Sequence, residues 1–211
     1  MTTYLTADTH FGHASIITSC NRLWATTEEM DEALIERWNA VVHPRDVVWH
    51  LGDFGYGSPE RLASLFGRLN GDKRLILGNH DVDKKGQVSK ALRALPWTRV
   101  AHGAEITHQD QRIVLDHYAG LAWSAQHYGA FLAFGHSHGK LAALPGSVDV
   151  GVDAQGYAPI SVEEFIRQAD ASLEDADARI DAVIRSLERK KQRLREQPFP
   201  LFAERRKGRQ A

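Results

Sequence analysis

Seven residues of metal-binding type stand at five points along the chain, and each point follows a short apolar run. They comprise two carboxylates, four imidazoles and one amide: Asp8, His10, Asp53, Asn79, His117, His136 and His138. A single tetrahedral zinc site needs four ligands, whereas seven ligands with one shared carboxylate fit two metal ions about 3.5–4 Å apart. Mixed nitrogen and oxygen ligands suit manganese, iron, zinc, cobalt or nickel better than magnesium or calcium. The residue types therefore predict a site for two divalent transition-metal ions.

The segment Gly78-Asn79-His80-Asp81 carries an amide, an imidazole and a carboxylate in a row, directly after an apolar run. The four hydrogen-bonding sites of an asparagine are hard to satisfy in a buried place. At the end of a predicted strand, Asn79 beside His80 therefore indicates a metal ligand next to an acid–base group. Taken alone, the segment fits an ordinary turn equally well; the other four points of the chain favour the site.

The first half of the chain alternates short apolar runs with helical patterns. The runs predict strands over residues 3–7, 46–51 and 73–77. One helix is predicted from a capping box of Thr26 and Glu29 to a stop at Pro44, and another begins at Ser58 with proline as its first residue. A third helix is predicted over residues 84–95. This order is typical of parallel β-α units.

After Pro96 the pattern changes to short β runs with few helices between them. They cover residues 98–101, 104–107, 112–116, 130–134 and 147–152, with a hairpin turn expected around Asp110. A capping box at Ser161 and Glu164 predicts a helix to about residue 169, and a charged helix is expected from 172 to about 196. The whole pattern predicts two layered β-sheets with helices outside, and ligands in such folds gather beyond the carboxyl ends of strands.

The bulk composition is that of a globular protein. The chain has 211 residues, of which 43% are hydrophobic and 25% charged. No apolar run reaches the ~18 residues that a membrane span requires, and the N-terminal residues lack the pattern of a signal peptide. The single cysteine, Cys20, excludes an internal disulfide framework. These features predict a cytoplasmic protein.

Charge divides the chain into an acidic body and a basic end. From Arg185 to Ala211 there are ten lysines or arginines and three glutamates, so the rest of the chain carries a net charge of −8. We expect a domain over residues 1–170 and a charged helical extension over 171–211 with a disordered basic end. A basic end can contact nucleic acid or a membrane surface, or form a solvated helix end. A thin apolar stripe on the extension suits packing on the body or on a helix of a second copy.

The motifs together resemble those of the calcineurin-like metallophosphoesterases, over roughly residues 4–169. The order and spacing match in Asp8-x-His10, Gly52-Asp53, Gly78-Asn79-His80-Asp81, His117 and Gly135-His136-x-His138. The longer segments around Asp8 and Asp53 are similar to those of small bacterial and phage phosphoesterases.

This resemblance implies an α/β fold, a four-layer αββα sandwich of two mixed β-sheets, followed by the C-terminal helical extension. It also implies hydrolysis of phosphate esters by a hydroxide that bridges two metal ions, with manganese the foremost candidate. The implied ligands are Asp8, His10 and His138 for the first metal, and Asn79, His117 and His136 for the second, with Asp53 bridging both. His80 would donate a proton to the leaving oxygen. Asp81 would orient His80 or cap a following helix.

One departure concerns the residues after Asp53. Protein phosphatases of this superfamily continue with an Asp-Arg-Gly run, whereas Phe54 and Gly55 follow here. The phosphate-binding arginine is thus absent, which disfavours a protein phosphatase. Arg22 is a candidate substitute, with a surface arginine as the alternative, and His13 is a candidate contact for substrate or for water.

Three functions follow from these residues. The leading one is a phosphoesterase for small phosphate esters or nucleotides, with monoesters and diesters both open. The second is a metal-binding scaffold without turnover, which the complete set of ligands disfavours. The third is a nucleic-acid-processing phosphodiesterase that uses the basic end to hold phosphates.

Overall fold

The computed structural model describes residues 1–142 and 144–196 of the chain. The chain divides into two compact units, Met1–Ser172 and Leu173–Ala211. The expected disordered end lies outside the described part, as do four of the ten basic residues of the predicted contact with nucleic acid, which begins at Arg185. None of the helices in the described part has the length and apolar character needed to cross a membrane.

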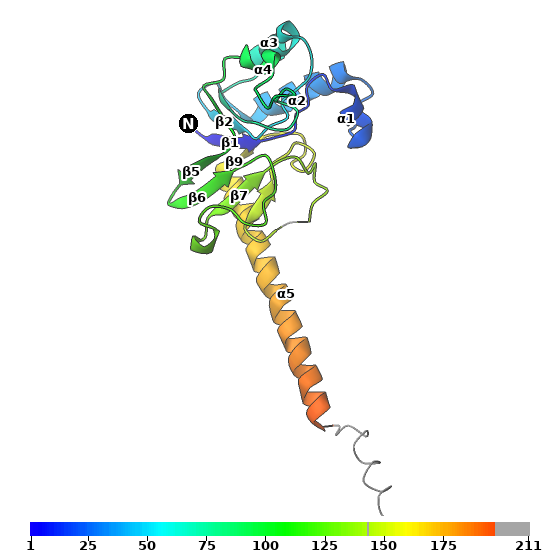
Figure 1. Cartoon of the computed structure of the whole chain (residues 1–211), viewed down its shortest axis with the longest axis vertical. Helices are drawn as coiled ribbons and strands as arrows, with labels where there is room; N and C mark the ends of the chain where they lie inside the picture. Colours follow the sequence, from blue (N-terminus) through cyan, green and yellow to red (C-terminus); the bar gives the residue numbers. More distant parts are fainter. Residues whose placement is uncertain (143, 197–211) are drawn as a thin grey trace, which may run out of the picture. The chain divides into compact units, whose positions relative to one another are not determined.

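Two mixed β-sheets form the first unit (Figure 1). The first sheet has the order β4-β3-β2-β1-β9, in which β9 alone is antiparallel to its neighbour. Its strands are β1 (Thr3–Thr6), β2 (Val47–His50), β3 (Asp72–Ile76), β4 (Arg99–Ala101) and β9 (Ile160–Ser161). The second sheet has the order β5-β6-β7-β8, in which β5 and β6 form the antiparallel pair. Its strands are β5 (Ala104–His108), β6 (Gln111–Leu115), β7 (Phe131–Phe134) and β8 (Ser147–Asp149).

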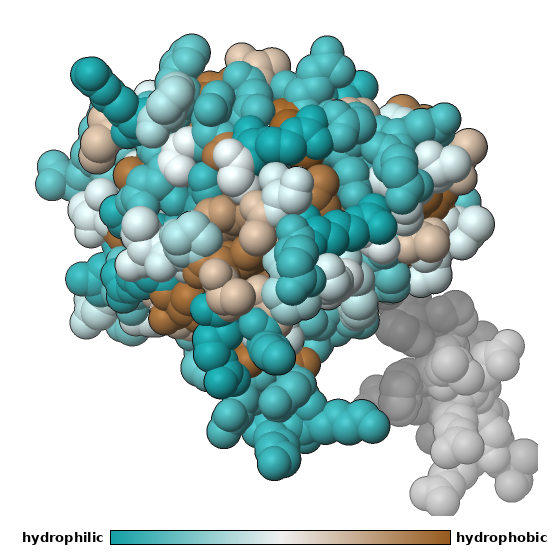
Figure 2. Space-filling view, turned by 90° about the horizontal axis from the view of Figure 1, so that it is seen from above, coloured by the Kyte–Doolittle hydropathy of each residue, from teal (hydrophilic) through white to brown (hydrophobic). Residues whose placement is uncertain are grey.

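Helices accompany the two mixed sheets and confirm the predicted α/β class. They are α1 (Ala14–Ser19), α2 (Thr27–Val41), α3 (Pro59–Arg68), α4 (Lys90–Arg93), the short 3₁₀ helix η1 (Gln126–Tyr128) and α5 (Val162–Glu196). Helices α1 to α4 lie on the side of the first sheet that faces away from the second sheet (Figure 1). Seen from above in that orientation, the surface is mostly hydrophilic, with apolar side chains in smaller groups (Figure 2).

Two hydrophobic cores hold these layers together. One packs α2 and α3 on the outer face of the first sheet, where Trp38 and Phe66 meet Val48 of β2. The other lies between the sheets and joins Trp49 of β2 to Phe131 of β7. Neighbouring residues of β2 thus enter different cores, because successive side chains of a strand point to opposite faces. Burial of each such large side chain contributes about 1.5–3 kcal/mol.

Several local signals are confirmed. The hydroxyl of Thr26 accepts from the N–H of Glu29, and that of Ser58 from the N–H of Arg61, so both predicted caps form. Gln109 and Asp110 take left-handed conformations in the turn that joins β5 to β6 as a hairpin.

Two predicted helices differ from the structure. Only Lys90–Arg93 is helical in the segment expected to be a helix over residues 84–95. The carboxylate of Asp83 accepts from the N–H groups of Lys85 and Gln87 and closes a turn there instead. The two helices expected after Ser161 form one continuous helix, α5, because no residue in that stretch of sequence interrupts helical hydrogen bonding.

Candidate active site

Three parallel strands of the first sheet end at one edge, and the loops beyond β1 and β2 run side by side. β1 pairs in parallel with β2, and β2 with β3. Beyond the strands, the N–H of Asp8 donates to the carbonyl of Gly52 over 2.9 Å, and the N–H of His10 donates to the backbone carbonyl of Asp53 over 3.0 Å. These bonds hold both loops in a fixed register, so side chains distant in sequence reach one place.

The second sheet brings its own loops to the same place. The N–H of Gly135, after β7, donates to the carbonyl of His117, after β6, over 3.0 Å. The next N–H, that of His136, donates to the carboxylate of Asp8 over 2.8 Å. A Cβ atom at Gly135 would lie 2.6 Å from Cβ of Ala7 and 2.8 Å from Oδ2 of Asp8. Only glycine allows so close an approach of the two sheets.

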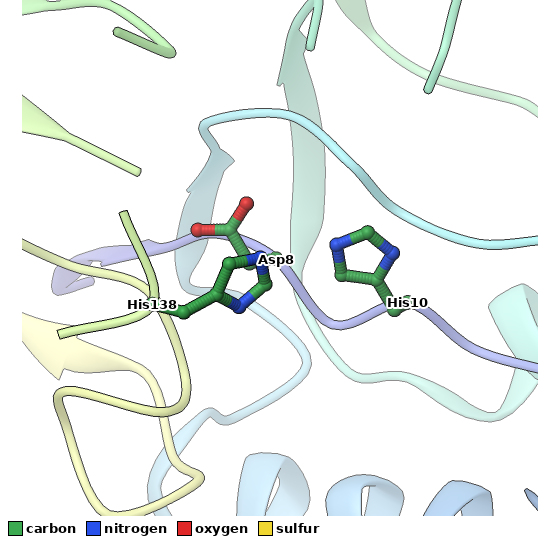
Figure 3. Close-up of side chains that lie close together, drawn as sticks. All are labelled: Asp8, His10 and His138. Atoms are coloured by element: carbon green, nitrogen blue, oxygen red, sulfur yellow. The ribbon is translucent and has the colours of Figure 1, made fainter. Parts of the chain in front are cut away.

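Asp8, His10 and His138 form one group of possible ligands (Figure 3). Each offers one atom, and these atoms lie within 4.8 Å of one another. Oδ1 of Asp8 and Nε2 of His10 are both buried, and neither has a hydrogen-bond partner among the described residues. Burial, together with the carboxylate of Asp53, raises the pKa of Asp8, whereas burial lowers that of His10. Two buried polar atoms without partners are costly, and a dication bound between them would satisfy both.

Asp53, His117 and His136 form a second group, with ligand atoms again within 4.8 Å of one another. Nδ1 of His117 is bonded to the carbonyl of Leu51 over 2.7 Å, which fixes the proton of a neutral ring on Nδ1. Its Nε2 then presents a lone pair to Oδ1 of Asn79, 3.1 Å away. Two acceptor atoms facing each other are stabilised by a cation that binds both. This donor set fits a second metal ion.

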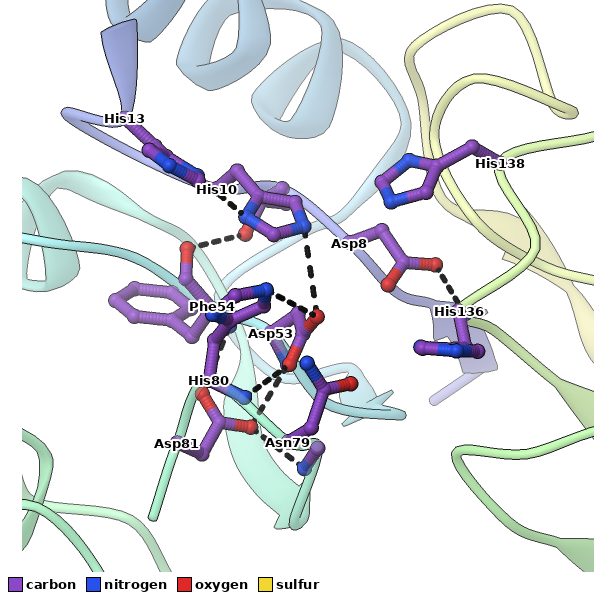
Figure 4. A network of polar contacts seen from close by, with 12 residues as sticks. Asp8, His10, His13, Asp53, Phe54, Asn79, His80, Asp81, His136 and His138 are labelled. Carbon is purple, nitrogen blue, oxygen red and sulfur yellow. Dashed lines mark hydrogen bonds and ion pairs between the residues drawn. The ribbon is translucent and has the colours of Figure 1, made fainter. Parts of the chain in front are cut away.

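The carboxylate of Asp53 also faces the first group, and Figure 4 shows it near His10, His80 and Asn79. Its Oδ2 is 3.5 Å from Nε2 of His10, and its Oδ1 is 3.7 Å from Nε2 of His117. The N–H of His80 donates to Oδ1 over 2.9 Å and steadies the carboxylate. One carboxylate thus presents an oxygen toward each group, as a bridging ligand does.

Five of the seven candidate ligands have a left-handed backbone, with φ between 49° and 67°. They are Asp8, His10, Asp53, His136 and His138. Such conformations are uncommon for residues other than glycine, cost of order 1–3 kcal/mol each, and cluster at functional sites. Here they turn each side chain back toward the common centre directly after a strand.

Other groups hold the ligand rings in orientation, as is usual around bound metals. Nδ1 of His138 lies 2.7 Å from Oδ2 of Asp153. Nδ1 of His10 lies 3.0 Å from Nδ1 of His13, whose Nε2 is 2.8 Å from the hydroxyl of Ser15. In the rings of His10 and His138 the nitrogen with this contact is Nδ1, which leaves Nε2 available to bind a metal ion.

Arg22 has no donor left for a phosphate. Its side chain is fully buried, and its guanidinium donates to both oxygens of Asp153, to the carbonyls of Asp8 and Thr9, and to the sulfur of Met30. These five bonds account for all its N–H groups. The expected phosphate contact of Arg22 is therefore not supported, and its observed contacts are those of an internal brace behind Asp8 and Asp153.

Asp81 makes no hydrogen bond to the ring of His80, and the N-cap of the following helix α4 is Ser89. Its buried carboxylate accepts from the N–H groups of Gly78, Asp53 and Phe54 over 2.7–3.0 Å. Burial raises its pKa to about 6, against the effect of these bonds. Asp81 ties the loop after β3 to the loop after β2, which corrects both expectations for this residue.

Tyr56 takes the place that Asp81 was expected to fill. Its hydroxyl is hydrogen-bonded to Nδ1 of His80, and its ring lies 4.2 Å from that of His13, centroid to centroid. Nε2 of His80 then faces Oδ2 of Asp53 at 4.0 Å. The side chain of His80 remains 39% exposed, so a ligand can reach it.

The seven candidate ligands were identified from the sequence, whereas two residues that contact this group, Tyr56 and Asp153, were not. The signal for Tyr56 was its place three residues after Asp53, where the expected arginine run is missing. Asp153 belongs to none of the five motifs and had no sequence signal. His13 was expected to contact substrate or water, and the structure places it against His10 and Tyr56.

Comparisons with known proteins identify the family of this chain. The model of a family described as calcineurin-like phosphoesterase matches residues 1–140. An uncharacterized protein of Methanocaldococcus jannaschii is 30% identical over 173 residues, which cover 78% of this chain and 89% of the relative. The gene 66 protein of Mycobacterium phage L5 is 28% identical over 184 residues, with coverages of 73% and 87%.

A solved structure shares the fold. A protein of unknown function from Aquifex aeolicus superposes with a TM-score of 0.60 at 24% identity, covering 77% of this chain and 96% of that one. At this identity the likeness supports the two-sheet architecture.

Proposed function

The chain belongs to the calcineurin-like phosphoesterase family and is a metal-dependent hydrolase of phosphoester bonds, and we propose that it acts through a centre of two metal ions. The observation that carries this proposal is the position of Asp53 between two groups of ligand atoms. The first ion would be held by Asp8, His10 and His138. The second would be held by Asn79, His117 and His136, with Asp53 shared.

Two buried ligand atoms that lack hydrogen-bond partners among the described residues support this assignment. Oδ1 of Asp8 and Nε2 of His10 are buried without a hydrogen bond, although most buried polar atoms have one. When bound, two divalent ions would lower the pKa of water and neutralise charge on the phosphoryl oxygens. Manganese is the metal to test first, since the ligands mix nitrogen with oxygen.

His80 is the proposed proton donor to the leaving oxygen. Its Nδ1 is engaged by Tyr56, so the proton available to a ligand is the one on Nε2, on the side of Asp53. A general acid in this position contributes about 10²–10⁴-fold to the rate. Tyr56 fixes the ring so that Nε2 keeps its direction.

Phosphodiesters are the substrate class that the charges favour. Within the described residues, the ion pairs of Asp53 involve only histidines. The guanidinium of Arg22 is occupied by hydrogen bonds inside the protein. The doubly charged phosphate of a monoester would be stabilised by a free guanidinium at this site. The phosphate of a diester carries a single negative charge and needs that stabilisation less.

The test is a turnover panel with and without Mn²⁺. It compares p-nitrophenyl phosphate, bis-p-nitrophenyl phosphate, and 2′,3′-cyclic and 3′,5′-cyclic nucleotides. We expect metal-dependent hydrolysis that is lost in Asp53→Asn and a higher kcat/KM for diesters than for monoesters. Asp116→Asn, which changes a carboxylate outside the seven ligands, is the matched control. Equal turnover by Asp53→Asn and the wild type would contradict the shared-carboxylate centre.

A further inference from the structure

Helix α5 carries an exposed apolar stripe in its part beyond Ser172. Leu173, Ile180 and Leu187 follow one another at intervals of seven residues, and the same spacing continues in the sequence to Leu194. The exposed fractions of the stripe's large side chains lie between 38% and 60%, for Leu173, Ile180, Val183, Ile184 and Leu187. A row of exposed aliphatic side chains such as this one indicates a surface that binds a partner.

The spacing of this stripe identifies the kind of partner. A seven-residue repeat averages 3.5 residues per turn, which keeps a narrow apolar seam facing a second helix in a coiled coil. An amphipathic helix in a protein gains most of its stability from packing its apolar face. Ala176 and Val183, three residues after Leu173 and Ile180, complete the alternation of three and four that such a seam requires.

Charge along the same helix sets the direction of pairing. The half from Leu173 to Ile184 contains four carboxylates and one arginine, whereas the half from Arg185 to Glu196 contains six basic and two acidic residues. Two copies in parallel would place acid beside acid and base beside base. Two copies in antiparallel orientation would place each acidic half beside a basic half, which is favourable and selects the register.

We infer that the stripe binds the α5 helix of a second copy of this chain, in an antiparallel coiled coil. Lys190 and Lys191 stand where the seam reaches the basic half of the helix. In the antiparallel pair their ammonium groups would meet the region of Glu174 and Asp175 of the second copy, while their methylene stems cover the seam. The stripe shares no residue with the proposed phosphoesterase site.

The first experiment measures the mass of the full-length protein by sedimentation equilibrium. We expect the mass of two chains for the wild type and of one chain for the double variant Val183→Glu, Leu187→Glu. The matched control, Ala178→Glu with Ala182→Glu, adds the same charges on the opposite face of the helix and should remain a dimer. Phosphoesterase turnover per chain should be unchanged in both variants, which also shows that they are folded.

The second experiment tests the direction of pairing in a Cys20→Ser background. A mixture of Leu173→Cys and Lys190→Cys proteins should form disulfide-linked heterodimers under mild oxidation, because antiparallel pairing brings opposite ends together. Leu173→Cys alone should not cross-link, since its two copies would lie at opposite ends.

Several results would overturn the inference. One is a wild type with the mass of a single chain, whether or not it binds vesicles of anionic lipid through the same stripe. Another is a dimer that the stripe variant leaves intact, because the contact would then lie elsewhere. Efficient cross-linking of Leu173→Cys to itself would contradict the antiparallel direction.

Discussion

The hydroxyl of Tyr56 is hydrogen-bonded to Nδ1 of His80. The two residues lie in different loops, one after β2 and one after β3, at the carboxyl edge of the first sheet. The bond leaves Nε2 of His80 as the group that faces Asp53 and an incoming ligand. The proposed proton donation by His80 and the orientation of its ring by Tyr56 thus belong to two residues, and each can be changed separately.

Replacing Tyr56 with phenylalanine removes the bond and keeps the ring. We expect kcat to fall about tenfold for substrates with an alkoxide or nucleoside leaving group, because a proton donor acts only when it is held in position. The loss should be small for p-nitrophenolate, which leaves without a proton. A series of leaving groups measures this difference, and Tyr128→Phe, an exposed tyrosine, is the control. An equal loss across the series would indicate a purely structural role.

Replacing His80 with alanine removes the proposed donor itself. The expected fall in kcat is about 10²–10⁴-fold for poor leaving groups, with little change in KM. Combining His80→Ala with Tyr56→Phe should cost no more than His80→Ala alone, since the tyrosine acts through the histidine. His102→Ala, in an exposed turn, serves as the matched control. Additive losses in the double variant would show that Tyr56 acts independently.

Replacing Asp153 with asparagine weakens two contacts at once. The carboxylate of Asp153 is hydrogen-bonded to Nδ1 of His138 and accepts from Nε and Nη2 of the buried Arg22. Burial acts to raise its pKa, but these two partners lower it. We expect metal affinity to fall about 10–100-fold and the free energy of unfolding to fall by about 3–5 kcal/mol.

Metal titration by calorimetry and urea unfolding of the metal-free protein separate these two effects. Asp170→Asn, at an exposed position on α5, is the control. Unchanged metal affinity in Asp153→Asn would mean that His138 does not depend on this carboxylate.

His50 makes stability depend on pH. It is fully buried beneath the site, its Nε2 is 2.9 Å from the hydroxyl of Thr9, and burial lowers its pKa to about 3. In the unfolded chain a histidine has a pKa of about 6.5. The native state therefore binds the proton less readily than the unfolded state. The contribution of His50 is fully present above pH ~6.5 and is lost as pH falls toward ~3.

A His50→Gln variant should thus lose less stability on acidification than the wild type. We expect the difference between the two unfolding free energies to change by about 1.4 kcal/mol per pH unit between roughly pH 6 and pH 4. Urea unfolding of the metal-free proteins at several pH values measures it. Parallel pH profiles of variant and wild type would show that His50 is not the group responsible.

The sequence alone identified the candidate ligands of the proposed centre. Asp8, Asp53, Asn79 and the three histidine positions after the second-sheet strands each follow an apolar run, and strand ends of this kind gather at one edge of a sheet. The strands, the helix caps at Thr26 and Ser58, and the α/β class also followed from local patterns. These features depend on neighbours within a few residues, which a sequence displays directly.

Only the tertiary structure decided what the remaining polar residues do. Arg22 and Asp153 are 131 residues apart and bond in the interior, so the sequence could not distinguish a brace from a phosphate ligand. Asp81 was assigned to its sequence neighbour His80, yet its three hydrogen bonds go to backbone N–H groups that chain folding brings within reach. A hydrogen bond depends on distance and angle in space, and for side chains that meet across loops the intervening fold sets both.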